Sequence, residues 1–214
     1  KEDEVLVKVM SDSICMSTYK LVAQGKKHKR APQNIDTNPV IVGHECSGII
    51  VEVGEKWKNQ FRPGQKFSLQ PALNYQGKLD SPGYSYEFCG GACTYCIMPH
   101  EVMELGCLLD YTGESFFEAS LGEPMSCIIG GYHANYHTNK KNYGHAMGTK
   151  EDGNILIMGG CGPMGLGAVS YGLQFENKPR RIVVTDISDD RIQRAREVIS
   201  EESAKKRGIE LRYV

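Results

Sequence analysis

The sequence predicts a β-rich domain followed by a parallel α/β domain, and three observations lead to this fold class. The first half of the 214-residue chain has short β-branched segments separated by long polar and glycine-containing loops. The second half alternates strand-like and helical segments at the spacing of a βαβ unit, which requires a parallel sheet. A glycine-rich turn joins the first strand of this second half to its first helix. We place the two domains at residues 1–138 and 139–214.

In the first domain, strands are expected where apolar, β-branched runs are bounded by turn residues. Residues 5–10 and 47–53 have this pattern, and residues 66–69 follow a Pro-Gly turn. Residues 115–136 have a helical pattern that is interrupted near 122–124 by glycine and proline. This domain should therefore consist mainly of strands and loops, with helix only toward its end.

In the second domain, a polar stretch at 139–153 is expected to act as the link to the first. Strands are expected at 154–158 and 181–185, with a small-residue helix at 164–175 between them. A charged helix should follow a Ser-Asp-Asp cap and run through 188–203. The chain begins close to one strand-like run and ends inside another, so we expect it to be part of a longer protein.

Composition excludes several classes of function. The net charge of −1 and the isoelectric point of about 6.7 argue against a general nucleic-acid binder. No apolar run is long enough to span a bilayer, and the first residues lack the apolar core of a signal peptide. Eight cysteines in a chain of this size do not require disulfides, so we expect mostly reduced thiols and a cytoplasmic location.

The glycine-rich turn Gly160-Cys161-Gly162-Pro163-Met164-Gly165 matches the pattern G-x-G-x-x-G. The first glycine permits a tight turn, the second lets the backbone approach a pyrophosphate, and the third lets the helix pack on the strand. The helix N-terminus adds free N–H groups and the positive end of its dipole. The strand before and the helix after favour a Rossmann-type dinucleotide site over the alternative, a tight turn in another kind of α/β protein.

The residues beyond the turn indicate which dinucleotide binds. Asp186 directly follows the second strand, where a carboxylate accepts hydrogen bonds from the adenine ribose and repels the 2′-phosphate of NADP. Arg191 is the nearest cation that could receive such a phosphate. We therefore expect NAD, with NADP less favoured. The expected cofactor-binding residues are Gly160, Gly162, Pro163, Met164, Gly165, Asp186 and Arg191.

A second set of residues has the chemistry of metal ligands. Cys15, His44, Glu45 and Glu123 supply one thiolate, one imidazole and two carboxylates, all of which bind zinc. A catalytic zinc ion takes three protein ligands and keeps one position open for water or substrate. Because the residues are far apart in sequence, their spacing leaves ordinary roles open: a buried inert thiol, a hydrogen-bonded turn histidine and a helix-start carboxylate.

Several segments of the chain resemble, in the same order, the zinc-containing medium-chain alcohol and polyol dehydrogenases. They are Cys15-Met16-Ser17, Gly43-His44-Glu45-Cys46-Ser47-Gly48, Val51-Glu52-Val53-Gly54, Gly122-Glu123-Pro124-Met125-Ser126-Cys127 and Gly160-Cys161-Gly162-Pro163-Met164-Gly165-Leu166. The resemblance implies a GroES-like β-rich catalytic domain and a Rossmann-type nucleotide domain, incomplete in this chain, with the active site between them. It also implies hydride transfer between a secondary alcohol and a nicotinamide.

The same resemblance implies roles for individual residues. Cys15, His44 and Glu123 would be the ligands of one catalytic zinc ion, and Glu45 the neighbouring carboxylate that can enter the coordination shell. Ser17 would be the hydroxyl that relays the substrate proton. The family's second, structural zinc is not expected, because Cys89, Cys93 and Cys96 lack a fourth ligand nearby. We expect Cys93 and Cys96 to point to opposite faces of a strand, because their separation is odd.

The basic run Lys26-Lys27-His28-Lys29-Arg30 bears on the substrate. It can hold a sugar phosphate, or it can be a solvated loop. Segments 24–30, 82–86 and 123–127 resemble family members that reduce a ketose phosphate. We therefore expect a small polyol, a ketose or its phosphate as substrate, and a homo-oligomer for the full-length protein.

Two other functions are alternatives for a chain with this sequence. One is a zinc-free quinone or enone reductase on the same fold, against which Cys15 and Glu123 argue. The other is a non-catalytic nucleotide-binding scaffold, against which the complete set of ligand residues and the glycine turn argue.

Overall fold

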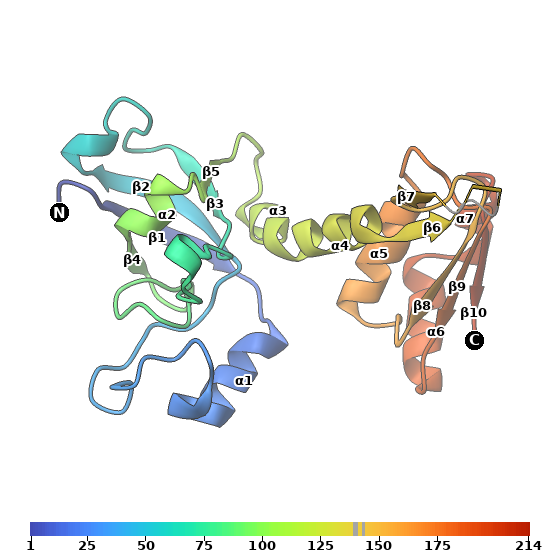
Figure 1. The fold of residues 1–214 in the computed structure, drawn as a ribbon, viewed down its shortest axis with the longest axis horizontal. Helices are drawn as coiled ribbons and strands as arrows, with labels where there is room; N and C mark the ends of the chain where they lie inside the picture. The colour runs from blue at the N-terminus through green and yellow to red at the C-terminus, as the bar shows by residue number, and fades with distance from the viewer. Residues whose placement is uncertain (139–140, 143) are drawn as a thin grey trace. The chain divides into compact units, whose positions relative to one another are not determined.

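The computed structural model describes residues 1–138, 141–142 and 144–214, which form two compact units. The first unit comprises Lys1–Glu123 and the second Pro124–Val214 (Figure 1). The first is β-rich and the second has a parallel sheet with helices, so the predicted fold class is confirmed. Each unit has its own apolar core.

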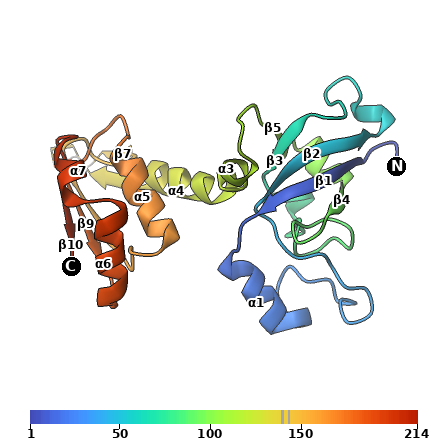
Figure 2. The same cartoon turned by 180° about the vertical axis from the view of Figure 1, so that it is seen from behind.

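The first unit is built on a five-stranded antiparallel sheet, visible from both sides in Figures 1 and 2. The strand order is β4-β1-β2-β3-β5, and the predicted strands at 5–10, 47–53 and 66–69 are confirmed. The strands are β1 (Val5–Asp12), β2 (Cys46–Val53), β3 (Lys66–Leu69), β4 (Tyr95–Met98) and β5 (Leu108–Asp110).

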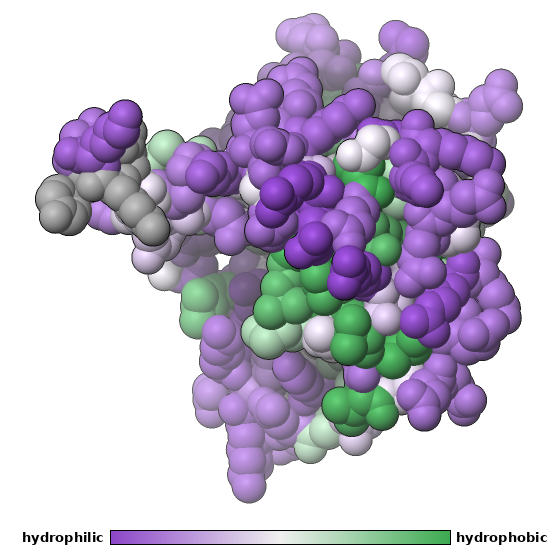
Figure 3. All heavy atoms as spheres, turned by 90° about the vertical axis from the view of Figure 1, so that its right-hand side faces the viewer, coloured by the Kyte–Doolittle hydropathy of each residue, from purple (hydrophilic) through white to green (hydrophobic). Residues whose placement is uncertain are grey.

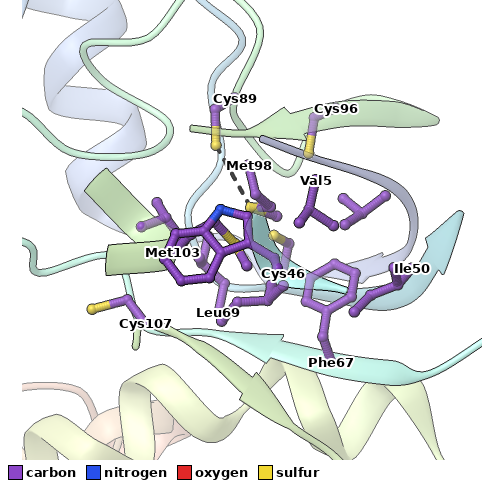
Figure 4. Packing of buried hydrophobic residues seen from close by; sticks show 14 of the residues in the cluster. Val5, Cys46, Ile50, Phe67, Leu69, Cys89, Cys96, Met98, Met103 and Cys107 are labelled. Atoms are coloured by element: carbon purple, nitrogen blue, oxygen red, sulfur yellow. Dashed lines mark hydrogen bonds between the residues drawn. The ribbon is translucent and has the colours of Figure 1, made fainter. Parts of the chain in front are cut away.

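The core of the first unit lies where side chains of the first four strands converge, as Figure 4 shows. Phe67 and Met98 are fully buried there, and the chain's single tryptophan, Trp57, packs among them. The Trp57 indole also donates a hydrogen bond of 2.8 Å to the backbone oxygen of Asp3. This core gives the sheet a fixed register, because shifting one strand by a residue would turn its apolar side chains outward.

The helices of the first unit are short, and two of them, at 16–24 and 100–104, were not predicted. Helix α1 (Met16–Gln24) buries only Leu21, while Tyr19 and Val22 are exposed. It therefore lacks the apolar face by which amphipathic helices are recognised in a sequence. The other helices of this unit are α2 (His100–Glu104), α3 (Phe116–Ser120) and three 3₁₀ turns at Gly25–Lys27, Glu55–Trp57 and Tyr75–Gly77.

The predicted helical stretch at 115–136 is present and is interrupted where expected. Helix α3 ends at Ser120, and helix α4 (Gly122–Ala134) follows after a single residue. Tyr132 of α4 donates a hydrogen bond of 2.7 Å to the backbone oxygen of Ala168. Because most of α4 packs with the residues that follow it, the two compact units divide at 123/124 rather than at 138/139.

The second unit has a three-stranded parallel sheet in the order β10-β9-β8. The strands are β8 (Asn154–Met158), β9 (Arg181–Thr185) and β10 (Glu210–Tyr213), which agrees with the predicted positions. Helix α5 (Pro163–Gly172) follows the glycine turn. The sheet and helix together form the expected βαβ arrangement.

The charged helix predicted to run to about Ser203 is in fact two helices. Helix α6 (Asp189–Val198) ends, and helix α7 (Glu201–Lys205) begins after a short break. Ser200 lies in the break with extended backbone dihedrals, and its hydroxyl accepts the backbone N–H of Ser203 at 3.1 Å. Serine is a preferred N-cap, so this residue starts a new helix rather than continuing the old one.

One face of the parallel sheet is covered by its own helices, and the other is more open. Ile182 and Val184 are fully buried in the core of this unit. On β8, in contrast, Leu156 and Met158 are 59% and 79% exposed. Figure 3 shows apolar patches of this kind within a mainly hydrophilic surface. Alternation along each strand accounts for the difference, because successive side chains point to opposite faces.

The predicted link at 139–153 is partly outside the described residues, which omit 139, 140 and 143. Its described part contains strand β7 (His145–Met147), which pairs with β6 (Tyr136–Thr138) in an antiparallel hairpin. Among the helices of the described residues, none is long and apolar enough to cross a membrane.

The expectation that Cys93 and Cys96 point to opposite faces is wrong. Cys96 is buried in the core of the first unit, and Cys93 packs against the same core while its thiol donates to the backbone oxygen of Gly90 at 3.1 Å. Strand β4 begins only at Tyr95, so Cys93 lies in the preceding bend, where strand alternation does not apply. A hydrogen bond that Cys96 donates to Cys89, followed by opposing effects of Cys93 and burial, raises the pKa of Cys96 to about 12, so this thiol is neutral at pH 7.

Replacing Phe67 by alanine should destabilise the first unit by about 3–5 kcal/mol, because it leaves a cavity in a close-packed core. Urea unfolding followed by the fluorescence of Trp57 measures this loss in the same core. Phe88→Ala is the matched control, because Phe88 is 58% exposed and should change stability little. Equal losses in the two variants would contradict this description of the core.

Candidate metal centre and nucleotide-binding turn

The antiparallel pairing of β1 and β2 brings two distant parts of the sequence together. At the end of the ladder Asp12 pairs with Cys46, so the chain that leaves β1 lies beside the chain that enters β2. The backbone N–H of Ser13 extends this contact by donating to the oxygen of Glu45 at 3.1 Å. Cys15, three residues after β1, is thereby placed beside His44, two residues before β2.

Cys15, His44 and Glu45 form a group that could hold a metal ion. One ligand atom from each lies within 4.8 Å of the others, and His44 and Glu45 are buried. Zinc bonds of about 2.0–2.3 Å in a tetrahedron keep ligand atoms roughly 3.5 Å apart, so small movements would close the site. The thiol, imidazole and carboxylate donors suit zinc and leave a fourth position, which is the arrangement of a catalytic site.

Each member of the group is held by a neighbour. Cys15 is the N-cap of α1, and its sulfur accepts the backbone N–H of Ser17 at 3.4 Å. The Glu45 carboxylate accepts a hydrogen bond from the Ser13 hydroxyl. The backbone N–H of Glu45 donates to the Asp12 carboxylate at 3.2 Å. Burial raises the pKa of Asp12 to about 6. These contacts orient the donor atoms before any metal binds.

His44 is held at both ring nitrogens. Nδ1 lies 3.5 Å from the hydroxyl oxygen of Thr18, and Nε2 lies 3.3 Å from that of Tyr84. Burial lowers the pKa of His44, opposed by the charge of Glu45 and assisted by that of Arg30. A neutral imidazole at pH 7 follows, and this is the form that binds a metal.

Tyr84 is a site residue that the sequence analysis did not identify. It is 5% exposed, its hydroxyl lies 3.3 Å from Nε2 of His44, and Ser17, the predicted proton relay, is near enough to lower its pKa. Burial raises its pKa, so the hydroxyl is protonated at neutral pH. Gly83 allows its loop to approach the backbone of Gly43, where a larger side chain would collide. The only signal in the sequence was its place within the segment 82–86.

Glu123, predicted as a metal ligand, is not a member of the group of three. It is the second residue of α4, and its charge contributes to raising the pKa of Tyr84. The carboxylate is therefore close enough to act electrostatically on the site. The geometry brings Glu45, rather than Glu123, together with Cys15 and His44.

The basic run divides into two parts. Lys26 forms an exposed ion pair with Asp36 at 3.1 Å. Arg30 instead lies over the ring of Tyr84, with its guanidinium carbon 5.4 Å from the ring centroid. The imidazole of His28 is stacked on the same ring at 5.5 Å. Only the end of the run therefore contacts the residues around the metal group.

The glycine turn in the second unit has the geometry that its pattern predicts. A side chain at Gly160 would collide with Ile157 and Val184, and one at Gly165 with the backbone of Gly160. Gly162, in contrast, is the N-cap of α5, and a Cβ there would meet nothing within 4 Å. The turn is closed where strand and helix meet, and open where a pyrophosphate would approach.

The other predicted cofactor residues lie around this turn. Pro163 and Met164 form the first turn of α5. The Asp186 carboxylate accepts backbone N–H groups of Cys161 and Ser188, each at 3.2 Å, and so ties the turn to the end of β9. Arg191, in the first turn of α6, is near enough for its charge to lower the pKa of Cys161 against the larger effect of burial.

Comparison with known proteins places these features in a family. Residues 1–110 match the alcohol dehydrogenase GroES-like domain. Mannitol-1-phosphate 5-dehydrogenase of Aliivibrio fischeri is 54% identical over 99% of this chain and 50% of its own length. L-sorbose 1-phosphate reductase of Klebsiella pneumoniae is 44% identical over 92% of this chain and 48% of its own. The chain thus spans about half the length of these curated relatives.

Solved structures show the same fold. The crystal structure of 2R,3R-butanediol dehydrogenase from Bacillus subtilis superposes with a TM-score of 0.69 and 23% identity, covering 99% of this chain and 56% of that one. Since the family model matches more than half of the chain and the likeness to relatives extends over nearly all of it, the chain belongs to the zinc-containing medium-chain family of alcohol and polyol dehydrogenases.

Proposed function

We propose that the protein is a zinc-dependent oxidoreductase that interconverts a secondary alcohol of a polyol phosphate and the corresponding ketone, with a nicotinamide as hydride carrier. The observation that carries this proposal is the grouping of Cys15, His44 and Glu45 within 4.8 Å. A zinc-free reductase on the same fold has no need of a thiol, an imidazole and a carboxylate converging at one point.

In this proposal Cys15, His44 and Glu45 hold the zinc ion. When bound, zinc supplies Lewis-acid chemistry, which polarises a carbonyl oxygen and lowers the pKa of an alcohol. Thr18 faces Nδ1 of His44, so a proton on Nδ1 directed at that hydroxyl leaves the lone pair of Nε2 for the metal. Glu123 stays outside the group and adds negative charge near the site.

Ser17 and Tyr84 are the proposed path for the substrate proton. Ser17 lies close enough to lower the pKa of Tyr84 against the larger effect of burial, and the Tyr84 hydroxyl lies 3.3 Å from Nε2 of His44. Because burial raises its pKa, Tyr84 keeps its proton at neutral pH, and its oxygen can accept a hydrogen bond from Ser17 while Nε2 of His44 is left to the metal. A pair of neutral hydroxyls can exchange protons without placing a charge in a buried position.

The nicotinamide cofactor is proposed to bind at the glycine turn of the second unit. Gly162 leaves room for the pyrophosphate, and the free N–H groups at the start of α5 would receive it. Asp186 favours NAD over NADP, because its carboxylate would repel a 2′-phosphate. Arg191 is the first cation after Asp186 in the sequence, and it lies in the first turn of α6, where its backbone N–H donates to the Ser188 hydroxyl.

The proposed substrate class follows from the relatives and from the basic run. The two relatives described above are named for mannitol 1-phosphate and L-sorbose 1-phosphate. The finer proposal is an L-sorbose-1-phosphate reductase. Mannitol 1-phosphate is a second candidate substrate, because the relative named for it is 54% identical to this chain, compared with 44% for the relative named for L-sorbose 1-phosphate. A coupled assay of NADH oxidation over ketoses and ketose phosphates, on the complete gene product, tests this class; a lack of activity on all of them would exclude it.

One zinc ion per subunit is expected in the complete gene product by elemental analysis. Cys15→Ala should remove most of the metal, while Cys127→Ala, which changes an exposed cysteine, should not. Glu45→Gln should lower zinc affinity more than Glu123→Gln, because only Glu45 belongs to the group of three. Two zinc ions per subunit, or unchanged metal in Cys15→Ala, would contradict the proposal.

NADH should be used better than NADPH, since repulsion by Asp186 is expected to cost on the order of 1–3 kcal/mol. Steady-state kcat/KM for the two cofactors measures the difference. Asp186→Asn should reduce the ratio of kcat/KM for NADH to kcat/KM for NADPH, because the side chain loses its charge while its amide oxygen still accepts a backbone N–H. Asp189→Asn is the control for a carboxylate in the exposed first turn of α6. A preference for NADPH in the unaltered protein would refute the assignment.

A ketose phosphate should be reduced more efficiently than the free ketose, by roughly ten- to hundredfold in kcat/KM, as one or two charge-assisted hydrogen bonds would give. The measurement compares sorbose 1-phosphate with sorbose at two ionic strengths. The ratio of kcat/KM for sorbose 1-phosphate to kcat/KM for sorbose should fall at the higher ionic strength, because salt screens partly exposed charges. Equal efficiencies would remove the phosphate from the proposal.

A further inference from the structure

We propose that Arg30, lying against the ring of Tyr84, is an anion subsite beside the metal centre and binds the phosphate group of the substrate. This inference rests on the proposed function and deepens it, because it assigns the substrate phosphate to one particular side chain. The sequence alone does not show which member of the basic run lies beside the metal centre. The contacts of Arg30 do.

Arg30 is half-buried, and within the described residues its charge is not paired with a carboxylate. Its guanidinium carbon lies 5.4 Å from the centroid of the Tyr84 ring, a cation–π distance. In the described part of the chain, no acidic side chain forms an ion pair with it. A guanidinium group that lies over an aromatic ring keeps the N–H groups at its edge available as donors. Two of these N–H groups can bind one phosphate in a bidentate manner.

The surroundings of Arg30 are positive as well. The His28 ring is stacked on Tyr84 with an interplanar angle of 15°, and its Nδ1 accepts the backbone N–H of Arg30 at 3.2 Å. Burial, followed by the charges of Arg30, Lys29 and Lys20, lowers the pKa of His28. The side-chain charges that act on His28 are therefore positive, which favours an anion beside it.

The subsite lies within reach of the metal group. The ring of Tyr84 is 4.9 Å from that of His44, and the Arg30 guanidinium carbon is 5.4 Å from the Tyr84 ring. The guanidinium carbon is thus at most about 10 Å from the His44 ring, the limit set by these two distances. A hexitol phosphate with its reacting carbon at the metal can span this distance.

Lys26 provides the contrast within the same run. Its ammonium group is paired with Asp36 at 3.1 Å, and both side chains are mostly exposed. An exposed ion pair of this kind has little net charge to offer and is readily screened. Loss of Lys26 removes the same formal charge as loss of Arg30, but away from Tyr84. This makes Lys26→Gln the matched control.

The test compares Arg30→Gln and Lys26→Gln with the unaltered complete gene product, using sorbose 1-phosphate and sorbose as substrates. Arg30→Gln should raise KM for the phosphorylated sugar by roughly ten- to hundredfold and change kcat/KM for the free sugar much less. Arg30→Lys, which keeps the charge but not the planar fork, should lie in between. Lys26→Gln should behave as the unaltered protein does.

A second readout does not depend on turnover. Titration with inorganic phosphate, followed by ³¹P line broadening, should show binding that Arg30→Gln weakens and Lys26→Gln does not. If sorbose 1-phosphate is not reduced but inorganic phosphate still binds through Arg30, the proposed function fails and the subsite stands. If the sugar phosphate is preferred and Arg30→Gln keeps that preference, the subsite is overturned and the function stands. Equal losses on both sugars would also overturn it, because they indicate a structural role.

Discussion

The register between β1 and β2 is the constraint on which the metal centre depends. The pairing of Asp12 with Cys46 sets the point at which β1 ends and the chain continues into α1. It therefore sets the position of Cys15 relative to His44. A slip of one residue would move every side chain of the strand to the other face of the sheet. Gly43 permits the turn before β2 with a φ of +90°, and a side chain there would collide with Asp12. The buried core beneath the sheet stabilises this register, and so holds ligands that are far apart in sequence.

Tyr84 links the metal group to the basic loop. Its hydroxyl approaches His44 and Ser17, while its ring face carries His28 and lies near the guanidinium of Arg30. One aromatic side chain therefore has a polar end toward the proposed chemistry and an aromatic face toward the proposed phosphate subsite. Aromatic residues of this type combine a rigid apolar body with a hydrogen-bonding tip. Changes at Tyr84 would be expected to affect both functions together.

In the second unit, Asp186 has two roles that are compatible. Its two oxygens each accept one backbone N–H, from Cys161 and Ser188, and so fix the glycine turn against the end of β9. An ionised carboxylate has about four lone-pair sites, so acceptors remain for ribose hydroxyls. The same charge that positions the turn is thus available to select the dinucleotide. Repulsion of a 2′-phosphate would therefore come from the same Asp186 carboxylate that holds the glycine turn.

The sequence by itself determined the local structure and the chemistry of the candidates. Period-two patterns, turn residues and the spacing of glycines identified β1, β2, β3, β8, β9 and the glycine turn, because these depend on neighbouring residues alone.

Only the tertiary structure decided which candidates meet. It grouped Glu45 with Cys15 and His44, placed Glu123 outside that group, put Cys93 in a bend beside Cys96, and separated Arg30 from Lys26. It also revealed Tyr84, whose surrounding loop carries no periodic signal. These outcomes depend on contacts between residues distant in sequence, which are fixed by strand register and packing and leave no local pattern.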